Sequence, residues 1–182
     1  MLIAVHDTET TGLPRHKRAK LDGQPRIIEF AGIITDGKSV ISQLEFICNP
    51  QVKELDPIIT KITGLTLEDL IDKPTLKEFL PQLTDYFGAA DAVISHNLSF
   101  DKGMMEFDLQ RLGLSLSDVR WPRLEVCTVE QTMHQFGRRM KLQELYEREC
   151  GPYVQKHRAM DDLLLLHEVC QRYGVYAAMG AC

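Results

Sequence analysis

The sequence predicts an α/β fold in which one mixed β-sheet is flanked by helices. Three strand-like apolar segments come first, joined by turns or loops without a helix between them. The remainder of the chain alternates helical periodicity with short apolar strands. The chain has 182 residues, which is enough for one domain with a sizeable core and too short for two full ones. We therefore expect a single domain over residues 1–182.

The N-terminal part of the chain contains the strands of an expected antiparallel meander. The first strand is an apolar run that should emerge from the core at His6, and Gly12 with Pro14 then breaks the chain. A tight-turn signal, Asp-Gly-Lys, separates the second strand from the third. Because short connections without a helix join antiparallel neighbours, these segments should pair in order. The predicted strands are 2–5, 27–35 and 40–48.

The rest of the chain alternates between helical and strand patterns. Apolar residues at spacings of three and four predict helices, and short apolar runs predict buried strands. The predicted helices are 74–87, 100–112, 142–146 and 159–173; a strand is predicted over 92–95, and a strand end running into a helix over 126–136. This order implies one mixed sheet with helices packed against it.

The composition is that of an ordinary globular chain. Hydrophobic residues make up 44% and charged residues 26%, which argues against disorder, a fibre or a disulfide-stapled mini-protein. No apolar stretch approaches the roughly 18 residues of a membrane helix, and the N-terminus lacks the basic region of a signal peptide. The five cysteines form no CxxC pair, which favours reduced thiols over disulfides or zinc. We therefore expect a cytoplasmic protein without membrane contact.

The charge is unevenly distributed along the chain. A net charge of −5 argues against binding nucleic acid by bulk attraction. Basic residues nevertheless gather in two short segments, and an isolated charge run is usually a solvated loop unless a nearby site needs an anion. The first cluster contains Arg15, Lys17, Arg18, Lys20 and Arg26, and the second contains Arg138, Arg139 and Lys141.

Two carboxylates follow the first apolar run. Asp7 and Glu9 are two positions apart, so they project on the same side of an extended chain. Carboxylates this close repel each other unless a cation or a proton intervenes, and they are costly to bury unpaired. The pattern predicts a divalent metal site, with a solvated turn as the alternative.

Further acids occur at the starts of two predicted helices. Asp101 shares a helical face with Met105, which turns it toward the core, although a first-turn acid favoured by the helix dipole is the alternative. Asp162 shares a face with Leu166 and therefore needs a partner. His157 lies just before that helix and is a candidate general base. Oxygen ligands without cysteine or paired histidines favour Mg²⁺ or Mn²⁺ over zinc.

These segments resemble the three motifs of the DnaQ-like 3′→5′ exonucleases. The histidine in the third motif is typical of the DEDDh subgroup, which includes proofreading exonucleases, the TREX enzymes, RNase T and oligoribonuclease. The resemblance spans nearly the whole chain in the family's order. It is carried by Asp7-Thr-Glu9-Thr-Thr-Gly-Leu-Pro, His96-Asn97-Leu-Ser-Phe100-Asp101 and His157-Arg-Ala-Met-Asp-Asp162.

The resemblance implies both a fold and a mechanism. The fold would be ribonuclease-H-like, with a five-stranded mixed sheet flanked by helices. Two Mg²⁺ or Mn²⁺ ions would be held by four acids, while His157 would take the proton of the attacking water. The product would be a nucleoside 5′-monophosphate released from a 3′ end. The acids that the resemblance assigns as catalytic metal ligands are Asp7, Glu9, Asp101 and Asp162.

The family pattern also implies contacts with the substrate strand. The terminal nucleotide would touch Thr10, Thr11 and Leu13, the last as an apolar wedge. Phe100 and Leu65 are equally expected to be core residues. Along the path of the strand, the expected contacts are His96, Asn97, Phe100 and Leu65.

The leading hypothesis is a metal-dependent 3′→5′ exonuclease acting on DNA ends. The alternatives are an exoribonuclease that trims RNA, and a non-catalytic nucleic-acid-binding or polymerase-accessory module that uses the same fold. The complete set of acids together with His157 argues against the module. Single-stranded 3′ ends are the expected partner, and a polymerase or replication protein is a further candidate. Only residues 174–182 follow the last predicted helix, so a polymerase-binding tail is not expected.

Overall fold

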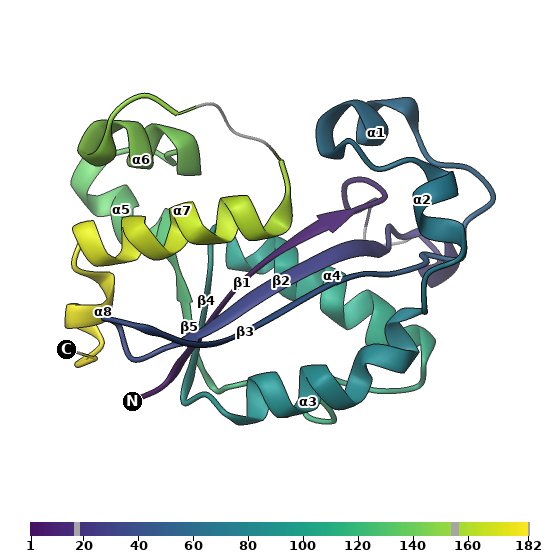
Figure 1. Cartoon of the computed structure of the whole chain (residues 1–182), viewed down its shortest axis with the longest axis horizontal. Helices are drawn as coiled ribbons and strands as arrows, with labels where there is room; N and C mark the ends of the chain where they lie inside the picture. The colour runs from purple at the N-terminus through teal and green to yellow at the C-terminus, as the bar shows by residue number, and fades with distance from the viewer. Residues whose placement is uncertain (17–18, 154–156, 182) are drawn as a thin grey trace.

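The computed structural model describes residues 1–16, 19–153 and 157–181. Its strands form one five-stranded sheet in the order β3-β2-β1-β4-β5 (Figure 1). β1 and β3 pair antiparallel with β2, whereas β4 pairs parallel with β1 and β5. The expected meander followed by parallel strands is therefore confirmed. The strands are β1 Ile3–Thr10, β2 Ile27–Thr35, β3 Val40–Ile47, β4 Ala92–Ser95 and β5 Leu124–Cys127.

Helices cover both faces of this sheet. α7 crosses one face, with α5, α6 and α8 beside it, and α3 and α4 lie on the other (Figure 1). The α-helices are α1 Pro57–Thr63, α2 Leu67–Ile71, α3 Leu80–Gly88, α4 Leu98–Arg111, α5 Thr128–Phe136, α6 Leu142–Cys150, α7 Ala159–Arg172 and α8 Val175–Ala178. The 3-10 helices are η1 Leu21–Gly23 and η2 Leu76–Phe79. Within the described ranges, none of the helices is long and apolar enough to cross a bilayer.

The alternation along β1 decides which side chains face α7. Ile3 and Val5 belong to the core cluster that includes the apolar residues of α7, whereas Ala4 belongs to the cluster that includes those of α3 and α4. Because successive side chains of a strand point to opposite faces, Asp7 and Glu9 continue the α7 face. The apolar run that builds the core thus also aims two carboxylates at the start of α7.

β1 extends further than its parallel neighbour. It pairs with β2 from Ile3 to Thr10, with a register shift between Glu9 and Thr10. In the part of the chain that the structure describes, β4 pairs with β1 only from Ile3 to Val5. The later half of β1 therefore has an open edge on the β4 side. α4 begins close to this edge because it follows β4 after two residues, His96 and Asn97.

Two of the sequence predictions need correction. His6 does not emerge from the core, because β1 continues to Thr10 and the His6 ring is fully buried against Phe30, Phe87 and Trp121. The helix predicted over 74–87 is divided into η2 and α3. The proline at position 81 has no N–H to donate to the carbonyl four residues earlier, so an α-helix cannot continue through it.

The short helices α1 and α2 were not predicted, although each has local signals. α1 is capped by Asp56, which accepts a hydrogen bond from the backbone N–H of Ile58 at 3.0 Å. Gly64 ends α1 with a φ of 75°, a left-handed conformation that favours glycine. Thr66 and Asp69 form a capping box at the start of α2. These signals fix the ends of helices that are too short to show apolar periodicity.

A glycine in the middle of β2 allows a tyrosine of α3 to reach the sheet. A Cβ atom added at Gly32 would lie 2.5 Å from Cζ of Tyr86. The hydroxyl of Tyr86 donates a hydrogen bond to the carbonyl of Val5 at 2.8 Å. This contact ties α3 to the part of β1 that immediately precedes the acidic residues.

Candidate active site

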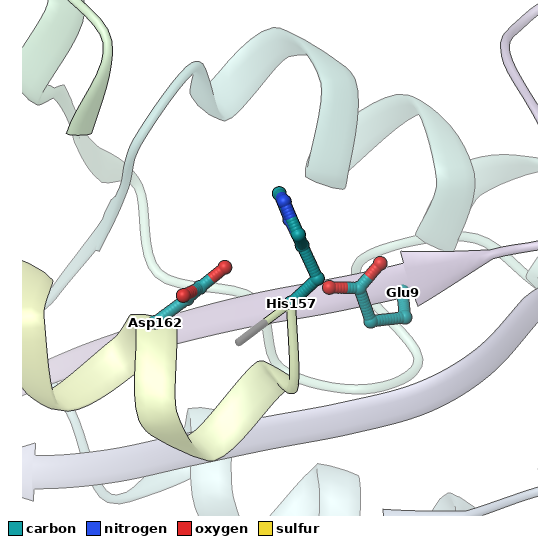
Figure 2. Close-up of side chains that lie close together, drawn as sticks. All are labelled: Glu9, His157 and Asp162. Carbon is teal, nitrogen blue, oxygen red and sulfur yellow. The ribbon is translucent and has the colours of Figure 1, made fainter. Parts of the chain in front are cut away.

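The described residues include a cluster of potential metal ligands at the start of α7. Ligand atoms of Glu9, His157 and Asp162 all lie within 4.8 Å of one another. Figure 2 shows the three side chains side by side, with Glu9 contributed by β1 and the other two by the first turn of α7 and the residues before it. The structure thus brings together residues from the first and last predicted motifs.

The acids in this centre resist ionisation when no cation is present. Burial, followed by the charge of Asp101 and then those of Glu9 and Asp162, raises the pKa of Asp7 well above its usual value. Burial and the charges of Asp162 and Glu29 raise the pKa of Glu9 to about 8. A divalent cation would relieve this repulsion, and its preferred oxygen ligands are present. The residues therefore fit a divalent metal ion.

Asp101 approaches from the opposite layer of the fold. It lies in the first turn of α4 and is 2% exposed. Its two oxygens accept hydrogen bonds from the hydroxyls of Thr8 at 2.7 Å and Ser95 at 2.8 Å. Burial raises the pKa of Asp101 to about 6, although both hydroxyls act in the lowering direction. Thr8 and Ser95, which orient this acid, were not predicted because isolated hydroxyl residues carry no spacing signal.

A fifth carboxylate, which the sequence did not suggest, lies on β2. Glu29 is fully buried and pairs in register with Glu9. Arg158 binds it through Nη2 at 2.6 Å and through Nε at 3.0 and 3.1 Å. The signal for Glu29 was a single acid within an otherwise apolar predicted strand, a position where a charge needs a partner.

A pocket of about 380 Å³ opens beside the acids. Asp7 and Asp162 form part of its wall, together with Asn97, Arg139 and Lys141. Asn97 has a left-handed backbone with a φ of 70°, and its Oδ1 accepts a hydrogen bond from Nη2 of Arg139 at 2.8 Å. The second basic cluster therefore meets the second motif at the site, where Arg139 and Lys141 line the same pocket as Asp7 and Asp162.

His96 lines the same pocket as a neutral ring. Burial lowers the pKa of His96 to about 4. Its Nε2 lies 3.2 Å from the carbonyl of Met140, and its Nδ1 lies 2.9 Å from Oγ1 of Thr128. Because a carbonyl only accepts, Nε2 donates to Met140 and Nδ1 accepts from Thr128. His96 is therefore held in one orientation and one tautomer.

The residues predicted to contact the terminal nucleotide, Thr10, Thr11 and Leu13, lie at and just after the end of β1. The hydroxyl of Thr10 donates to the carbonyl of Gly12 at 2.8 Å, and Oγ1 of Thr11 accepts from the backbone N–H of Arg26 at 2.9 Å. Both threonines thus shape the turn. Leu13 is 78% exposed, which suits the predicted apolar wedge.

The two residues that were equally expected in the core do pack there. Leu65 is 6% exposed and packs with Ile28 and Leu70, which leaves little surface for a base. Phe100 is partly buried against the cluster on the α4 face. Their contacts with substrate stay predictions.

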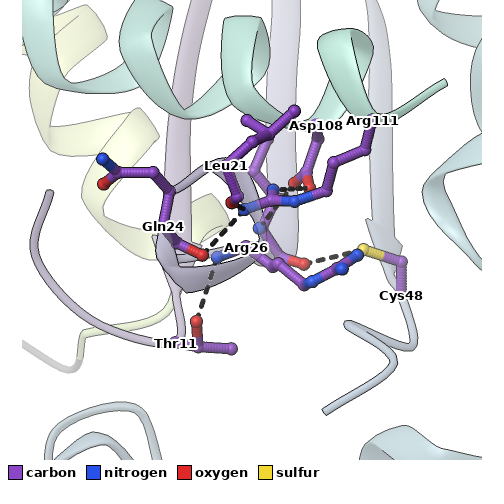
Figure 3. A network of polar contacts seen from close by, with 8 residues as sticks. Thr11, Leu21, Gln24, Arg26, Cys48, Asp108 and Arg111 are labelled. Carbon is purple, nitrogen blue, oxygen red and sulfur yellow. Dashed lines mark hydrogen bonds and ion pairs between the residues drawn. The ribbon is translucent and has the colours of Figure 1, made fainter. Parts of the chain in front are cut away.

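The loop that carries the first basic cluster is anchored to the end of α4 (Figure 3). Arg111 pairs with Asp108 at 2.6 Å and donates through Nη2 to the carbonyls of Leu21 and Gln24, both at 2.7 Å. Asp108 also accepts from the backbone N–H of Ile27 at 2.8 Å. Lys17 and Arg18 of the cluster lie outside the described residues.

Comparisons with known proteins identify the family of this chain. The RNase T family model, described as exonuclease, matches residues 4–170. A PolC-type DNA polymerase III from Caldanaerobacter subterraneus is 27% identical over 165 residues, which cover 91% of this chain and 11% of that protein. A PolC-type DNA polymerase III from Staphylococcus aureus is 32% identical over 114 residues, which cover 62% of this chain and 7% of that protein. The chain spans about a tenth of the length of these relatives.

Several solved structures share the fold. The zinc-bound complex of E. coli ExoI with single-stranded DNA has a TM-score of 0.77 at 18% identity, covering 93% of this chain and 39% of that chain. The nuclease domain of 3′hExo, a DEDDh family member bound to rAMP, has a TM-score of 0.74 at 14% identity, covering 94% and 90%. The ribonuclease-H-like fold is thereby confirmed. Because the family model covers most of the sequence, the chain belongs to the RNase T exonuclease family, among the DnaQ-like 3′→5′ exonucleases.

Proposed function

We propose that this chain removes nucleoside 5′-monophosphates one at a time from the 3′ ends of single-stranded DNA, using two Mg²⁺ or Mn²⁺ ions. The convergence of Glu9, His157 and Asp162, with Asp7 in the same charged centre, carries the proposal. The choice of DNA is supported by the relatives, which are named as DNA polymerases. A replicative polymerase is accordingly the proposed partner.

Each residue has a distinct role in this proposal. Asp7, Glu9 and Asp162 hold the cations, and Asp101 contributes from the α4 layer either directly or through water. Bound divalent cations supply positive charge to the reacting phosphate and make water a stronger nucleophile near neutral pH. His157 accepts the proton of the attacking water, since a ring nitrogen of His157 lies within 4.8 Å of carboxylate oxygens of Glu9 and Asp162.

The substrate strand is proposed to enter along the pocket beside the acids. Leu13 presents an exposed apolar side chain next to the end of β1, where it would pack against the terminal base. Asn97 and Arg139 offer polar groups to the phosphates on the other side. His96 is proposed to act through its position in the pocket wall, because its low pKa keeps it uncharged at neutral pH.

The decisive experiment uses a 5′-labelled single-stranded DNA and the RNA of the same sequence. Each is incubated with Mg²⁺, Mn²⁺ or EDTA and resolved on a sequencing gel. A ladder that shortens from the 3′ end, is lost with EDTA and forms faster on DNA is the expected result. Faster degradation of RNA would replace the DNA proposal with the exoribonuclease alternative. An EDTA-resistant ladder would contradict the metal requirement.

A further inference from the structure

The ion pair between Glu29 and Arg158 is connected to the site by covalent and hydrogen bonds. The backbone N–H of Ala159, the first residue of α7, donates to Oε2 of Glu29 at 3.3 Å. One carboxylate therefore binds both the side chain of Arg158 and the backbone at the start of α7. The carbonyl of Arg158 in turn accepts from the N–H of Asp162 at 3.0 Å. Contacts thus run from Glu29 through Arg158 to a predicted metal ligand.

The backbone conformation of His157 depends on the same contacts of Glu29. His157 immediately precedes Arg158 and has a φ of 51°, a left-handed conformation that is uncommon outside glycine. A non-glycine residue keeps such a conformation when its surroundings fix it. The three contacts of Arg158 and the one of Ala159 provide this constraint directly after His157.

Glu29 also adds a negative charge to a centre that already holds several. It pairs with Glu9 across β1 and β2, and its charge is among the causes that raise the pKa of Glu9. Arg158 acts on Glu9 in the opposite direction. An acid this deeply buried would be costly without its arginine.

We propose that Glu29 is a positioning residue for hydrolysis, which sets His157 against the acids by holding Arg158 and the first turn of α7. The positive charge of Arg158 balances the negative charge of Glu29. The pair therefore leaves the net charge around the metal-binding acids unchanged. The inference rests on the proposed nuclease function for its kinetic part. Its electrostatic part concerns metal binding and can be measured without turnover.

A pair with a purely structural role would behave differently. Buried ion pairs contribute little net stability compared with apolar residues of similar size, and breaking one costs stability wherever it lies. A structural role therefore predicts loss of melting temperature without a specific dependence on His157 or on metal. A positioning role predicts that the kinetic loss acts through His157.

The kinetic test is a double-mutant cycle between Glu29→Gln and His157→Ala at saturating metal. Glu29→Gln keeps the size of the side chain and removes its charge. We expect it to lower kcat about 10- to 100-fold with little change in KM. This is the usual range for mutation of residues that orient the side chains of a metal site. In the His157→Ala background we expect the same change to lower kcat less than about twofold, because the residue it positions is gone. Equal losses in both backgrounds would overturn the proposal.

The second readout is Mn²⁺ binding measured by calorimetry, which does not require activity. Glu29→Gln leaves the positive charge of Arg158 uncompensated, so Mn²⁺ affinity should fall several-fold. Arg158→Gln should not weaken Mn²⁺ binding, and the double variant Glu29→Gln/Arg158→Gln should recover most of the lost affinity. Arg172→Gln breaks an exposed pair with Glu168 on the same helix and is the matched control, with wild-type binding and kcat expected.

These measurements separate failure of the inference from failure of the proposed function. If wild-type protein hydrolyses neither DNA nor RNA, the function fails while Mn²⁺ binding still tests the charge balance. Equal Mn²⁺ affinity in wild type and Glu29→Gln, with both proteins folded by circular dichroism, would overturn the inference. Arg158→Lys keeps the positive charge but loses the bidentate contact with Glu29, so we expect Mn²⁺ affinity like that of the wild type and a lower kcat.

Discussion

At the scale of single residues, the site is a set of carboxylates whose charges are incompatible without a cation. The sequence predicted Asp7, Glu9 and Asp162 because their spacing on a strand or helix places them toward the core. It could not predict Glu29, since one acid among apolar residues has no partner nearby in the chain. The partner, Arg158, is distant in sequence, and only folding brings the two together.

His157 is the residue whose removal should affect turnover most selectively. His157→Ala should lower kcat about 10²- to 10⁴-fold, the usual range for loss of a general base, with a modest effect on substrate binding. Single-turnover assays at neutral pH measure the chemical step. Turnover close to that of the wild type would refute the assignment of His157 as the base.

The raised pKa of Glu9 predicts that metal binding depends on pH. With a pKa of about 8 in the native state and an ordinary value of 4.5, Glu9 binds more protons when folded than when unfolded between these limits. Metal-free stability should therefore fall as pH rises through this window, and Mn²⁺ affinity should increase as binding displaces the proton. Calorimetry in buffers of different ionisation enthalpy measures the protons released. Absence of proton release at pH 7 would contradict the protonated state of Glu9.

At the scale of elements, segments with a clear apolar pattern were predictable and those without one were not. β2 and β4 match the predicted bounds, because a buried strand has a continuous apolar run. β1 was predicted too short, since its polar second half looks like a loop until β2 pairs with it. The segment 74–87 was predicted as one helix from its apolar spacing, but the structure divides it near Pro81. Here the missing backbone N–H of the proline outweighs the apolar pattern.

Because β2 and α3 pack closely at Gly32, we expect any larger side chain at this position to lower stability. Gly32→Ala should lower the free energy of unfolding by about 1–3 kcal/mol, the usual cost of overpacking, because its Cβ would meet the ring of Tyr86. Urea denaturation measures the change. Gly103→Ala is the matched control: apart from its chain neighbours and the backbone of its own helix, no heavy atom of the described residues lies within 4 Å of the added Cβ. Alanine also favours the helix, so about 0.5–1 kcal/mol of stabilisation is expected. Equal effects at both positions would contradict the packing argument.

At the scale of the whole molecule, a net charge of −5 opposes a polyanionic substrate, so attraction has to be local. The mixed sheet and its longer helices were predictable from the sequence. The anchoring of the basic loop to α4 was not, because Asp108 and Arg111 lie far from that loop in sequence. The placement of Arg139 in the site pocket likewise depends on the fold.

Two adjacent arginines test this local attraction. Arg139→Ala should raise KM for an oligonucleotide and reduce the slope of log KM against log salt by about one, as expected for the loss of one phosphate contact. Arg138 pairs with Glu144 at 3.0 Å and is not among the residues that line the pocket, so Arg138→Ala should change the slope less. Titration with salt across both variants measures the difference. Identical slopes would argue against a phosphate contact by Arg139.

The position of α7 in the sequence has a consequence for how the site assembles during synthesis and folding. Asp7 and Glu9 are translated well before His157 and Asp162. During synthesis, the cluster of Glu9, His157 and Asp162 therefore cannot assemble until α7 has been translated and packs on the sheet. A product truncated before His157 would lack two of the three clustered side chains, and we expect it not to hydrolyse nucleic acid.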